Sequence, residues 1–138
     1  MMKVLEKDDK KTVFKGEVIP GRQIGRTIGF PTANLRVNSE EEPYLPKGVY
    51  GVQVYYKGVS YRGVMNIGIR PTFKGEKPTV SFEVYILDFN QDIYGEQLTI
   101  DILFFIRNEQ AFDSIEQLVQ QLKNDIEKAN EQFLLVNC

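Results

Sequence analysis

Hydrophobic and polar residues alternate along five segments of the chain, which is the pattern of β-strands with one buried face. In residues 79–87, for example, every second position is hydrophobic, from Val80 to Ile86. The five segments are 12–19, 48–56, 59–67, 79–87 and 97–106. Short stretches rich in turn-forming residues separate several of them, which favours an antiparallel sheet.

The last of these segments predicts the longest hydrophobic face. Its alternation places five residues on one side of a single strand, namely Leu98, Ile100, Ile102, Phe104 and Ile106. Earlier in the chain, only Lys57 and Gly58 separate two strand segments, which is the length of a tight hairpin turn. These two segments are therefore predicted to pair with each other.

The hydrophobic period changes after residue 113, where apolar residues begin to recur every three or four positions, as on one side of a helix. These residues are Ile115, Leu118, Val119, Leu122, Ile126, Ala129 and Phe133. Ser114 and Gln117 have the spacing of a capping box, with Asp113 or Ser114 as the N-cap. We expect a helix from about residue 114 to 134 whose apolar side packs on the rest of the domain.

Strands without intervening helices, followed by one helix, predict a mainly β fold: an antiparallel barrel with the helix packed on it. The 138 residues fit one domain, which we expect to span 12–138 after a charged tail of residues 1–11. This tail lacks the apolar stretch of a signal peptide, and no apolar run has the length of a membrane span. With the single cysteine, Cys138, these features favour a cytoplasmic protein.

Charge and histidine content narrow the possible chemistry. Lys and Arg number 17 against 19 Asp and Glu, so a general nucleic-acid-binding surface is not expected. The chain has no histidine, which excludes Ser-His-Asp catalysis and histidine zinc sites within it. An acid–base group would have to be a carboxylate, Lys, Tyr or the terminal Cys. A metal held by oxygen atoms would be Mg²⁺ more readily than Zn²⁺.

A glycine-rich loop at residues 20–35 is the most unusual stretch. Gly21, Gly25 and Gly29 recur every four residues, and glycines let backbone N–H groups converge on an anion. Arg22 and Arg26 lie among them, and arginine matches phosphate oxygens well. The loop has neither the Gly-Lys-Ser/Thr of a P-loop nor the spacing of a dinucleotide fingerprint. We interpret it as a candidate phosphate-binding loop.

Two further positions carry candidate chemistry. Pro31 favours an extended chain, in which Thr32 and Asn34 point to the same side and offer two neutral oxygens to Mg²⁺. The alternative is that both side chains only satisfy backbone groups of a turn. Glu83, in the middle of a strand segment, is either an exposed carboxylate or a general base.

Together these motifs resemble the riboflavin kinases, and above all the kinase domain of bacterial bifunctional riboflavin kinase/FMN adenylyltransferases. The resemblance extends from about Gly16 to about Phe133. It rests on G-x-x-x-G-R-x-x-G-F-P-T-A-N, followed by LPKGVYGV, GVMNIGIRPTF, FEVYILDFNQDIYGE and IRNEQAFDSIEQLVQQLKNDIEKA. The family fold is a six-stranded antiparallel Greek-key barrel with a C-terminal helix. Its activity is Mg²⁺-dependent transfer of the γ-phosphoryl group of ATP to the 5′-hydroxyl of riboflavin, giving FMN and ADP.

The resemblance also implies roles for individual residues. Glu83 would be the catalytic base, and Thr32 and Asn34 would contact Mg²⁺, or Zn²⁺ or Mn²⁺ in its place, and the nucleotide phosphates. The other positions that match the nucleotide side are Gly21, Arg26, Ile86, Asp88 and Tyr94. Those that match the flavin side are Arg107, Gln110 and Gln117.

One position departs from the family pattern, and several alternatives stay open. Many members carry His two residues after the catalytic Glu, where this chain has Tyr85. The chain is too short to contain an adenylyltransferase domain as well, so it is a stand-alone monomeric kinase or a module of a bifunctional FAD synthetase. A non-catalytic barrel that binds flavin or nucleotide is a second alternative. A barrel that binds oligonucleotides is a third, which the acidic composition disfavours.

Overall fold

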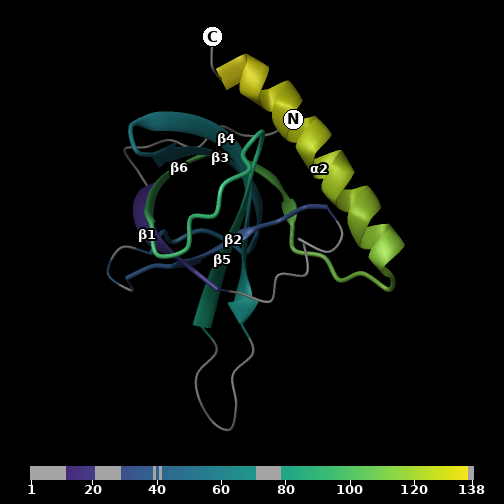
Figure 1. The fold of residues 1–138 in the computed structure, drawn as a ribbon. Coiled ribbons are helices and arrows are strands. Elements are labelled where there is room, and N and C mark those ends of the chain that lie inside the picture. Colours follow the sequence, from purple (N-terminus) through teal and green to yellow (C-terminus); the bar gives the residue numbers. More distant parts are fainter. Residues whose placement is uncertain (1–11, 21–28, 39, 41, 71–78, 137–138) are drawn as a thin grey trace, which may run out of the picture.

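The protein is described here by a computed structural model that covers residues 12–20, 29–38, 40, 42–70 and 79–136. This part of the chain contains six strands and one helix (Figure 1). The strands are β1 (Val13–Ile19), β2 (Ala33–Arg36), β3 (Gly48–Tyr56), β4 (Val59–Arg70), β5 (Thr79–Ile86) and β6 (Gln97–Asn108). The helix is α2 (Ile115–Val136), and it lies along the outside of the barrel.

The strands close into an antiparallel barrel in the order β1-β2-β5-β4-β3-β6. Strands β3, β4 and β5 follow one another as neighbours, whereas β2 lies beside β5 and β6 lies beside β3. Strands β3, β4 and β5 form one Greek key together with β2 and a second one together with β6. The predicted six-stranded barrel with a C-terminal helix is therefore confirmed.

The hydrophobic alternation located five of the six strands. The turn at Lys57 and Gly58 is confirmed, and both residues have positive φ, 49° and 78°, as in a type I′ hairpin. The sixth strand, β2, has only four residues and follows the glycine-rich loop, where alternation predicted no strand. Its pairing with β1 on one side and β5 on the other closes the barrel.

Strand β6 differs from its prediction beyond Ile102. Two register shifts against β3 interrupt the alternation, and each inserts an extra residue. Leu98, Ile100 and Ile102 belong to the barrel interior, whereas Phe104 belongs to the cluster under α2 and contacts its Phe133 with 5.1 Å between ring centroids. The single hydrophobic face predicted for this strand is wrong, because the bulges turn its second half toward the helix.

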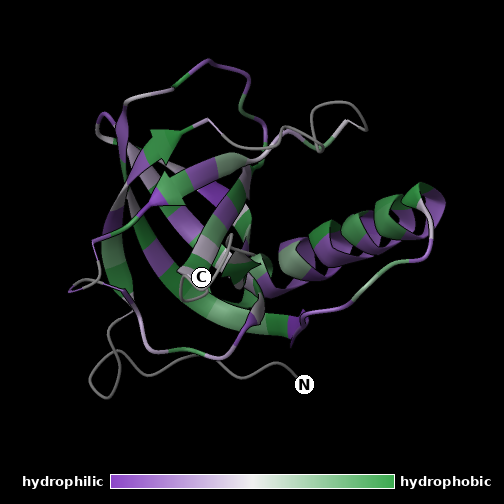
Figure 2. Ribbon diagram, turned by 90° about the horizontal axis from the view of Figure 1, so that it is seen from below, coloured by the Kyte–Doolittle hydropathy of each residue, from purple (hydrophilic) through white to green (hydrophobic). Residues whose placement is uncertain are grey.

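Helix α2 begins where the capping signal predicted. The Gln117 N–H donates to the Ser114 hydroxyl over 3.2 Å, and the Asp113 N–H donates to the Gln117 side-chain oxygen over 3.1 Å. Ser114 is thus the N-cap. The helix carries hydrophobic and hydrophilic residues on different sides (Figure 2), and it packs against β3, β4 and β6. This packing buries Ala129 and Phe133 completely.

Within the described residues, α2 is the only helix, and it is not apolar enough to cross a membrane.

Candidate functional site

A row of side chains runs across the outer wall of the barrel, facing α2. Strand register pairs Asn34 on β2 with Glu83 on β5, and Glu83 with Asn66 on β4. The row continues through Val49 on β3 to Arg107 on β6. Directly paired residues of neighbouring strands have Cβ atoms about 5 Å apart. Glu83 is therefore flanked on both sides by a carboxamide side chain.

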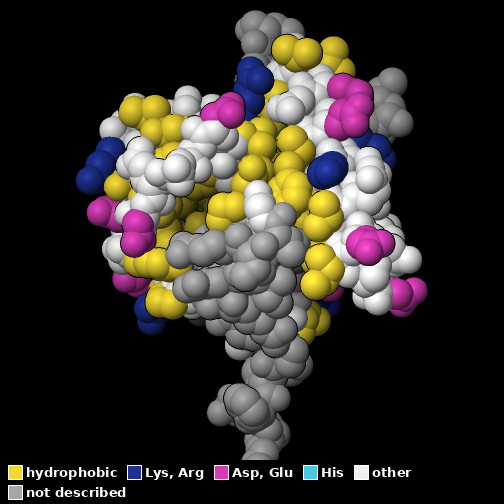
Figure 3. All heavy atoms as spheres, turned by 45° about the vertical axis from the view of Figure 1, so that its right-hand side comes forward, with side chains coloured by type: hydrophobic (Ala, Val, Ile, Leu, Met, Phe, Trp, Pro, Cys, Tyr) yellow, Lys and Arg dark blue, Asp and Glu magenta, His cyan; other side chains and the backbone are white. Residues whose placement is uncertain are grey.

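This row forms one wall of a cavity between the barrel and α2, which we call the helix-side cavity. Its volume is about 330 Å³. Apolar side chains of the helix, among them Leu118, Leu122 and Ile126, form the opposite wall. Figure 3 shows the face of the molecule along which α2 lies. Hydrophobic side chains gather in the middle of this face, and charged side chains lie around them. Apolar walls with a few polar groups are typical of a site for an organic ligand.

A second cavity, of about 420 Å³, lies beside the turn between β5 and β6, and we call it the turn-side cavity. Val84 and Ile86 reach it from β5, and residues 89–94 line it from the turn. The turn is fixed to the barrel by backbone hydrogen bonds to Val18, with the Gly95 N–H donating to its carbonyl and its own N–H donating to the Glu96 carbonyl. Two backbone hydrogen bonds therefore hold in place the turn that lines this cavity.

The segment Phe30–Asn34 separates the two cavities. Phe30 and Asn34 line the helix-side cavity, Pro31 and Ala33 line the turn-side cavity, and Thr32 lines both. This alternation is that of an extended chain, as the proline predicted. Thr32 and Asn34 consequently face the same cavity, and Thr32 marks the place where the two cavities meet.

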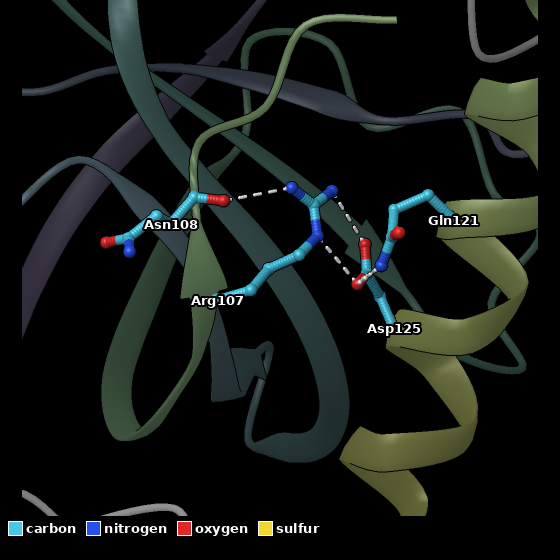
Figure 4. A network of polar contacts seen from close by, with 4 residues as sticks. All are labelled: Arg107, Asn108, Gln121 and Asp125. Atoms are coloured by element: carbon cyan, nitrogen blue, oxygen red, sulfur yellow. Dashed lines mark hydrogen bonds and ion pairs between the residues drawn. The ribbon is translucent and has the colours of Figure 1, made fainter.

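A buried ion pair connects the barrel to the helix at the end of the row (Figure 4). Arg107 donates to both carboxylate oxygens of Asp125, over 2.8 and 2.9 Å, and to the backbone carbonyl of Asn108 over 3.1 Å. The Gln121 amide donates to the same carboxylate over 3.0 Å. Asp125 is fully buried, and the Arg107 side chain is 16 % exposed. This network sets how α2 lies against β6.

The predicted nucleotide-side residues are placed in different ways. Ile86 and Tyr94 line the turn-side cavity. Asp88 is exposed with a positive φ of 55° in the turn after β5, and it is not among the residues that line this cavity. Gly21 and Arg26 lie outside the described residues, so the predicted phosphate-binding loop stays a prediction.

The predicted flavin-side residues also differ in their surroundings. Arg107 and Gln110 line the helix-side cavity, as Glu83 and Tyr85 do. Gln117 instead caps α2 and is exposed. The structure thus brings together the predicted base, the Thr32–Asn34 pair and two of the three flavin-side residues.

Sequence reasoning missed three polar or charged residues of the helix-side cavity. Asp125 occupies a position on the apolar stripe of the helix, and a charge at such a position signals a buried partner. Asn66 and Glu109 gave no signal, because only the strand register and the chain path after β6 bring them beside Glu83 and into this cavity.

The donor set suits a hard cation that shares its ligands with phosphate. Thr32 offers a hydroxyl oxygen and Asn34 a carboxamide oxygen, and Asn34 is 5 % exposed beside the Glu83 carboxylate. No group of three or more His, Cys, Asp or Glu side chains able to hold a metal occurs in the part of the chain that the structure describes. These neutral oxygens fit Mg²⁺, which takes few protein ligands and keeps water and phosphate oxygens.

This barrel, with a carboxylate placed near the junction of two cavities, defines a ligand-binding domain of the flavokinase type. The sequence matches the family model described as riboflavin kinase over residues 9–133, and the chain belongs to this family.

Two curated relatives illustrate the match. The chain is 42 % identical over 125 residues to the "RNA-binding riboflavin kinase RibR" of Bacillus subtilis, covering 91 % of this chain and 53 % of that protein. It is 48 % identical over 112 residues to the bifunctional riboflavin kinase/FMN adenylyltransferase of Listeria monocytogenes, covering 80 % of this chain and 35 % of that protein. The chain thus spans about half of the first relative and about a third of the second.

Two solved structures have the same fold. A Streptococcus pneumoniae protein described as a macrolide-efflux protein matches with a TM-score of 0.77 and 44 % identity, over 86 % of this chain and 38 % of that one. Riboflavin kinase from Trypanosoma brucei matches with a TM-score of 0.64 and 25 % identity, over 91 % of this chain and 81 % of that one.

Proposed function

We propose that this protein phosphorylates riboflavin, transferring the γ-phosphoryl group of ATP to the ribityl 5′-hydroxyl to give FMN and ADP. One observation carries the proposal beyond family membership. Thr32 lines both cavities, and the candidate base Glu83 lies on the strand next to this segment, in the wall of the helix-side cavity. The two cavities therefore suit two substrates that meet end to end.

The cavities differ in the ligand they suit. The helix-side cavity combines apolar helix residues with the aromatic rings of Phe30 and Tyr85, which lie edge-to-face with centroids 5.7 Å apart. It suits the flavin, a flat and largely apolar ring system with a polar chain. The turn-side cavity, bounded by Pro31 and Thr32, suits the nucleotide. We assign ATP to the turn-side cavity and riboflavin to the helix-side cavity.

We propose Glu83 as the general base, which its location in the wall of the helix-side cavity supports. Glu83 is paired with Asn34 on the neighbouring strand. Thr32, two residues before Asn34, lines the cavity that we assign to the nucleotide. In the proposed reaction, Glu83 accepts the proton of the 5′-hydroxyl while the hydroxyl oxygen bonds to the γ-phosphorus and the bond to the ADP oxygen breaks. The carboxamides of Asn34 and Asn66 on either side orient the carboxylate.

Mg²⁺ would be held by the Thr32 hydroxyl and the Asn34 carboxamide together with ATP oxygens. When bound, it neutralises charge on the phosphate oxygens. Thr32 and Asn34 align the nucleotide from the segment between the cavities, and α2 excludes water from the flavin side. Zn²⁺ or Mn²⁺ in place of Mg²⁺ is tested by exchanging the metal in the assay.

The direct test is to incubate the purified protein with riboflavin, ATP and Mg²⁺ and to separate the flavins by chromatography. We expect FMN in proportion to the amount of enzyme, and none when Mg²⁺ is removed with a chelator. Flavin binding without any FMN would instead support the alternative of a non-catalytic flavin-binding barrel. If the protein neither bound riboflavin nor formed FMN, the proposal would be refuted.

We further propose that the domain works as a monomer, or as the kinase part of a longer bifunctional protein. The cavities on which the proposal rests are formed within one chain. Size-exclusion chromatography with light scattering measures the mass in solution, and the mass of a dimer would contradict this part of the proposal.

The same kinase assay can also be examined for FAD, with pyrophosphatase added to drive its formation from FMN and ATP. We expect FAD only if an adenylyltransferase domain is present.

A further inference from the structure

A second carboxylate lies on the same outer wall of the barrel as Glu83. Glu109, directly after β6, bends back over β4 at Gly68. A Cβ placed on Gly68 would lie only 2.5 Å from a carboxylate oxygen of Glu109 and 3.3 Å from the side-chain nitrogen of Asn66. The absence of a side chain at Gly68 thus provides the space into which the Glu109 carboxylate fits.

Strand register fixes where this carboxylate lies relative to Glu83. Gly68 pairs with Ser81, which precedes Glu83 by two residues on the same face of β5. Two residues of a strand span about 7 Å. The nucleotide side lies in the opposite direction along β5, because Val84 and Ile86 line the turn-side cavity. Glu109 is therefore about one strand repeat beyond Glu83, on the side away from the nucleotide.

The charges of the helix-side cavity favour a neutral ligand with hydrogen-bond donors. Among the described residues that line it, Arg107 is the one cation, and Asp125 takes two of its N–H groups. Glu83 and Glu109 add two further carboxylates. An ionised carboxylate only accepts hydrogen bonds, so both of them call for O–H or N–H donors on the ligand.

The chain before Glu109 is held in place from two directions. Arg107 is fixed to the helix by Asp125, and its guanidinium also donates to the backbone carbonyl of Asn108 over 3.1 Å. This ties down the backbone of the residue directly before Glu109. The carboxylate is thus carried by an anchored segment, which reduces the entropy cost of using it to bind a ligand.

We propose that Glu109 is a substrate-binding residue whose carboxylate accepts hydrogen bonds from hydroxyl groups of the ribityl chain. This inference rests on the proposed function. With the 5′-hydroxyl at Glu83, a carboxylate about 7 Å away lies within reach of the hydroxyls nearer the ring. Asn66, between the two carboxylates, completes a polar strip along the sugar-alcohol chain.

The first test replaces Glu109 by Ala and compares two ligands. Loss of a hydrogen bond to a charged group is expected to raise KM for riboflavin about tenfold and to leave kcat nearly unchanged. Affinity for lumiflavin, which has the ring but no hydroxyl chain, should not change in a fluorescence titration. Glu127→Ala, at an exposed glutamate of α2, is the matched control and should behave as the wild type.

The second test displaces the carboxylate without removing it. Gly68→Ala puts a methyl group where the Glu109 carboxylate lies, and the flexible end of that side chain can move away. We expect a similar rise in KM. In the Glu109→Ala background, the same substitution should have little further effect, because the two changes act on one contact.

The outcomes separate this inference from the proposed function. FMN formation by the wild type with an unchanged KM in Glu109→Ala would overturn the role of Glu109 alone. An equal loss of lumiflavin affinity would also overturn it, because the contact would then be to the ring. A wild-type protein that neither binds nor phosphorylates riboflavin would overturn both proposals.

Discussion

The proposed base, Glu83, can be tested by replacing its carboxylate with an amide of the same size. Glu83→Gln keeps the size of the side chain between Asn34 and Asn66 but removes its ability to accept a proton at neutral pH. Because general-base catalysis contributes about 10²–10⁴-fold, we expect kcat to fall by about that factor with little change in KM for riboflavin. The measurement is steady-state FMN formation. Glu127→Gln is the control, and wild-type turnover in Glu83→Gln would exclude this base.

A buried tyrosine, Tyr50, is expected to make the stability of the fold depend on pH in the alkaline range. The Tyr50 hydroxyl donates to the Pro46 carbonyl over 2.6 Å, and burial raises the pKa of Tyr50 to about 12 from 10.0. Below pH 10 the Tyr50 hydroxyl is protonated in both the folded and the unfolded chain, and its contribution to stability is fully present. Between about pH 10 and 12 the unfolded chain ionises first, so the free energy of unfolding falls as the pH rises.

Tyr50→Phe should reduce this dependence. At pH 8 the variant is expected to lose about 1 kcal/mol, for the missing hydrogen bond. From pH 8 to pH 11 its free energy of unfolding should fall less than that of the wild type, because position 50 no longer titrates. Urea unfolding at the two pH values measures both effects. Equal pH dependence of the two proteins would show that Tyr50 does not contribute.

At the scale of elements, the ion pair between Arg107 and Asp125 joins α2 to β6, in addition to the hydrophobic packing of Ala129 and Phe133. Asp125→Ala would leave Arg107 buried without its carboxylate, and breaking such a pair costs about 3–5 kcal/mol. We expect lower stability in urea and, because the helix forms one wall of the helix-side cavity, a higher KM for riboflavin.

A double-mutant cycle distinguishes the pair from general damage to the helix. Arg107→Ala combined with Asp125→Ala should cost clearly less than the sum of the single substitutions, because each single change leaves one unpaired charge. Additive losses would mean that the two side chains act independently. Glu127→Ala, exposed on the same helix, is expected to change stability by less than about 0.5 kcal/mol.

Local patterns could predict most elements, because alternation, helical period and caps are properties of short stretches. Lys57–Gly58 and Ser114 are examples, and both occur as predicted. The four-residue β2 is too short to show a period, and its existence depends on two neighbouring strands. The bulges of β6 are set by what Phe104 packs against, which alternation does not contain.

The candidate site divides in the same way. The common direction of Thr32 and Asn34 followed from an extended chain after proline, and the structure has it. That Glu83 lies between Asn34 and Asn66 depends on the register of three strands, which a single sequence does not reveal. Glu109 reaches the same wall only because Gly68 leaves space for it. Long-range pairing, rather than composition, makes these residues neighbours.

For the whole molecule, the net charge of −2 predicts that single-stranded RNA is not among its ligands. One relative is described as an RNA-binding riboflavin kinase, and this chain matches 53 % of that protein's length. The net charge of this chain is −2, whereas sequence-independent binding to RNA requires a surface rich in Lys and Arg. Carboxylates also outnumber cations among the described residues of the helix-side cavity.

We therefore expect no binding of single-stranded RNA to this chain at about 0.15 M salt, where phosphate contacts are already weakened. Fluorescence anisotropy with a labelled oligonucleotide measures it, and riboflavin titrated into the same sample shows that the protein is folded and active in binding. Affinity that falls steeply with salt would contradict the expectation. If that affinity also disappeared on adding riboflavin and ATP, the RNA would share the two cavities, and the charge of the whole chain would be a poor guide to its local surface.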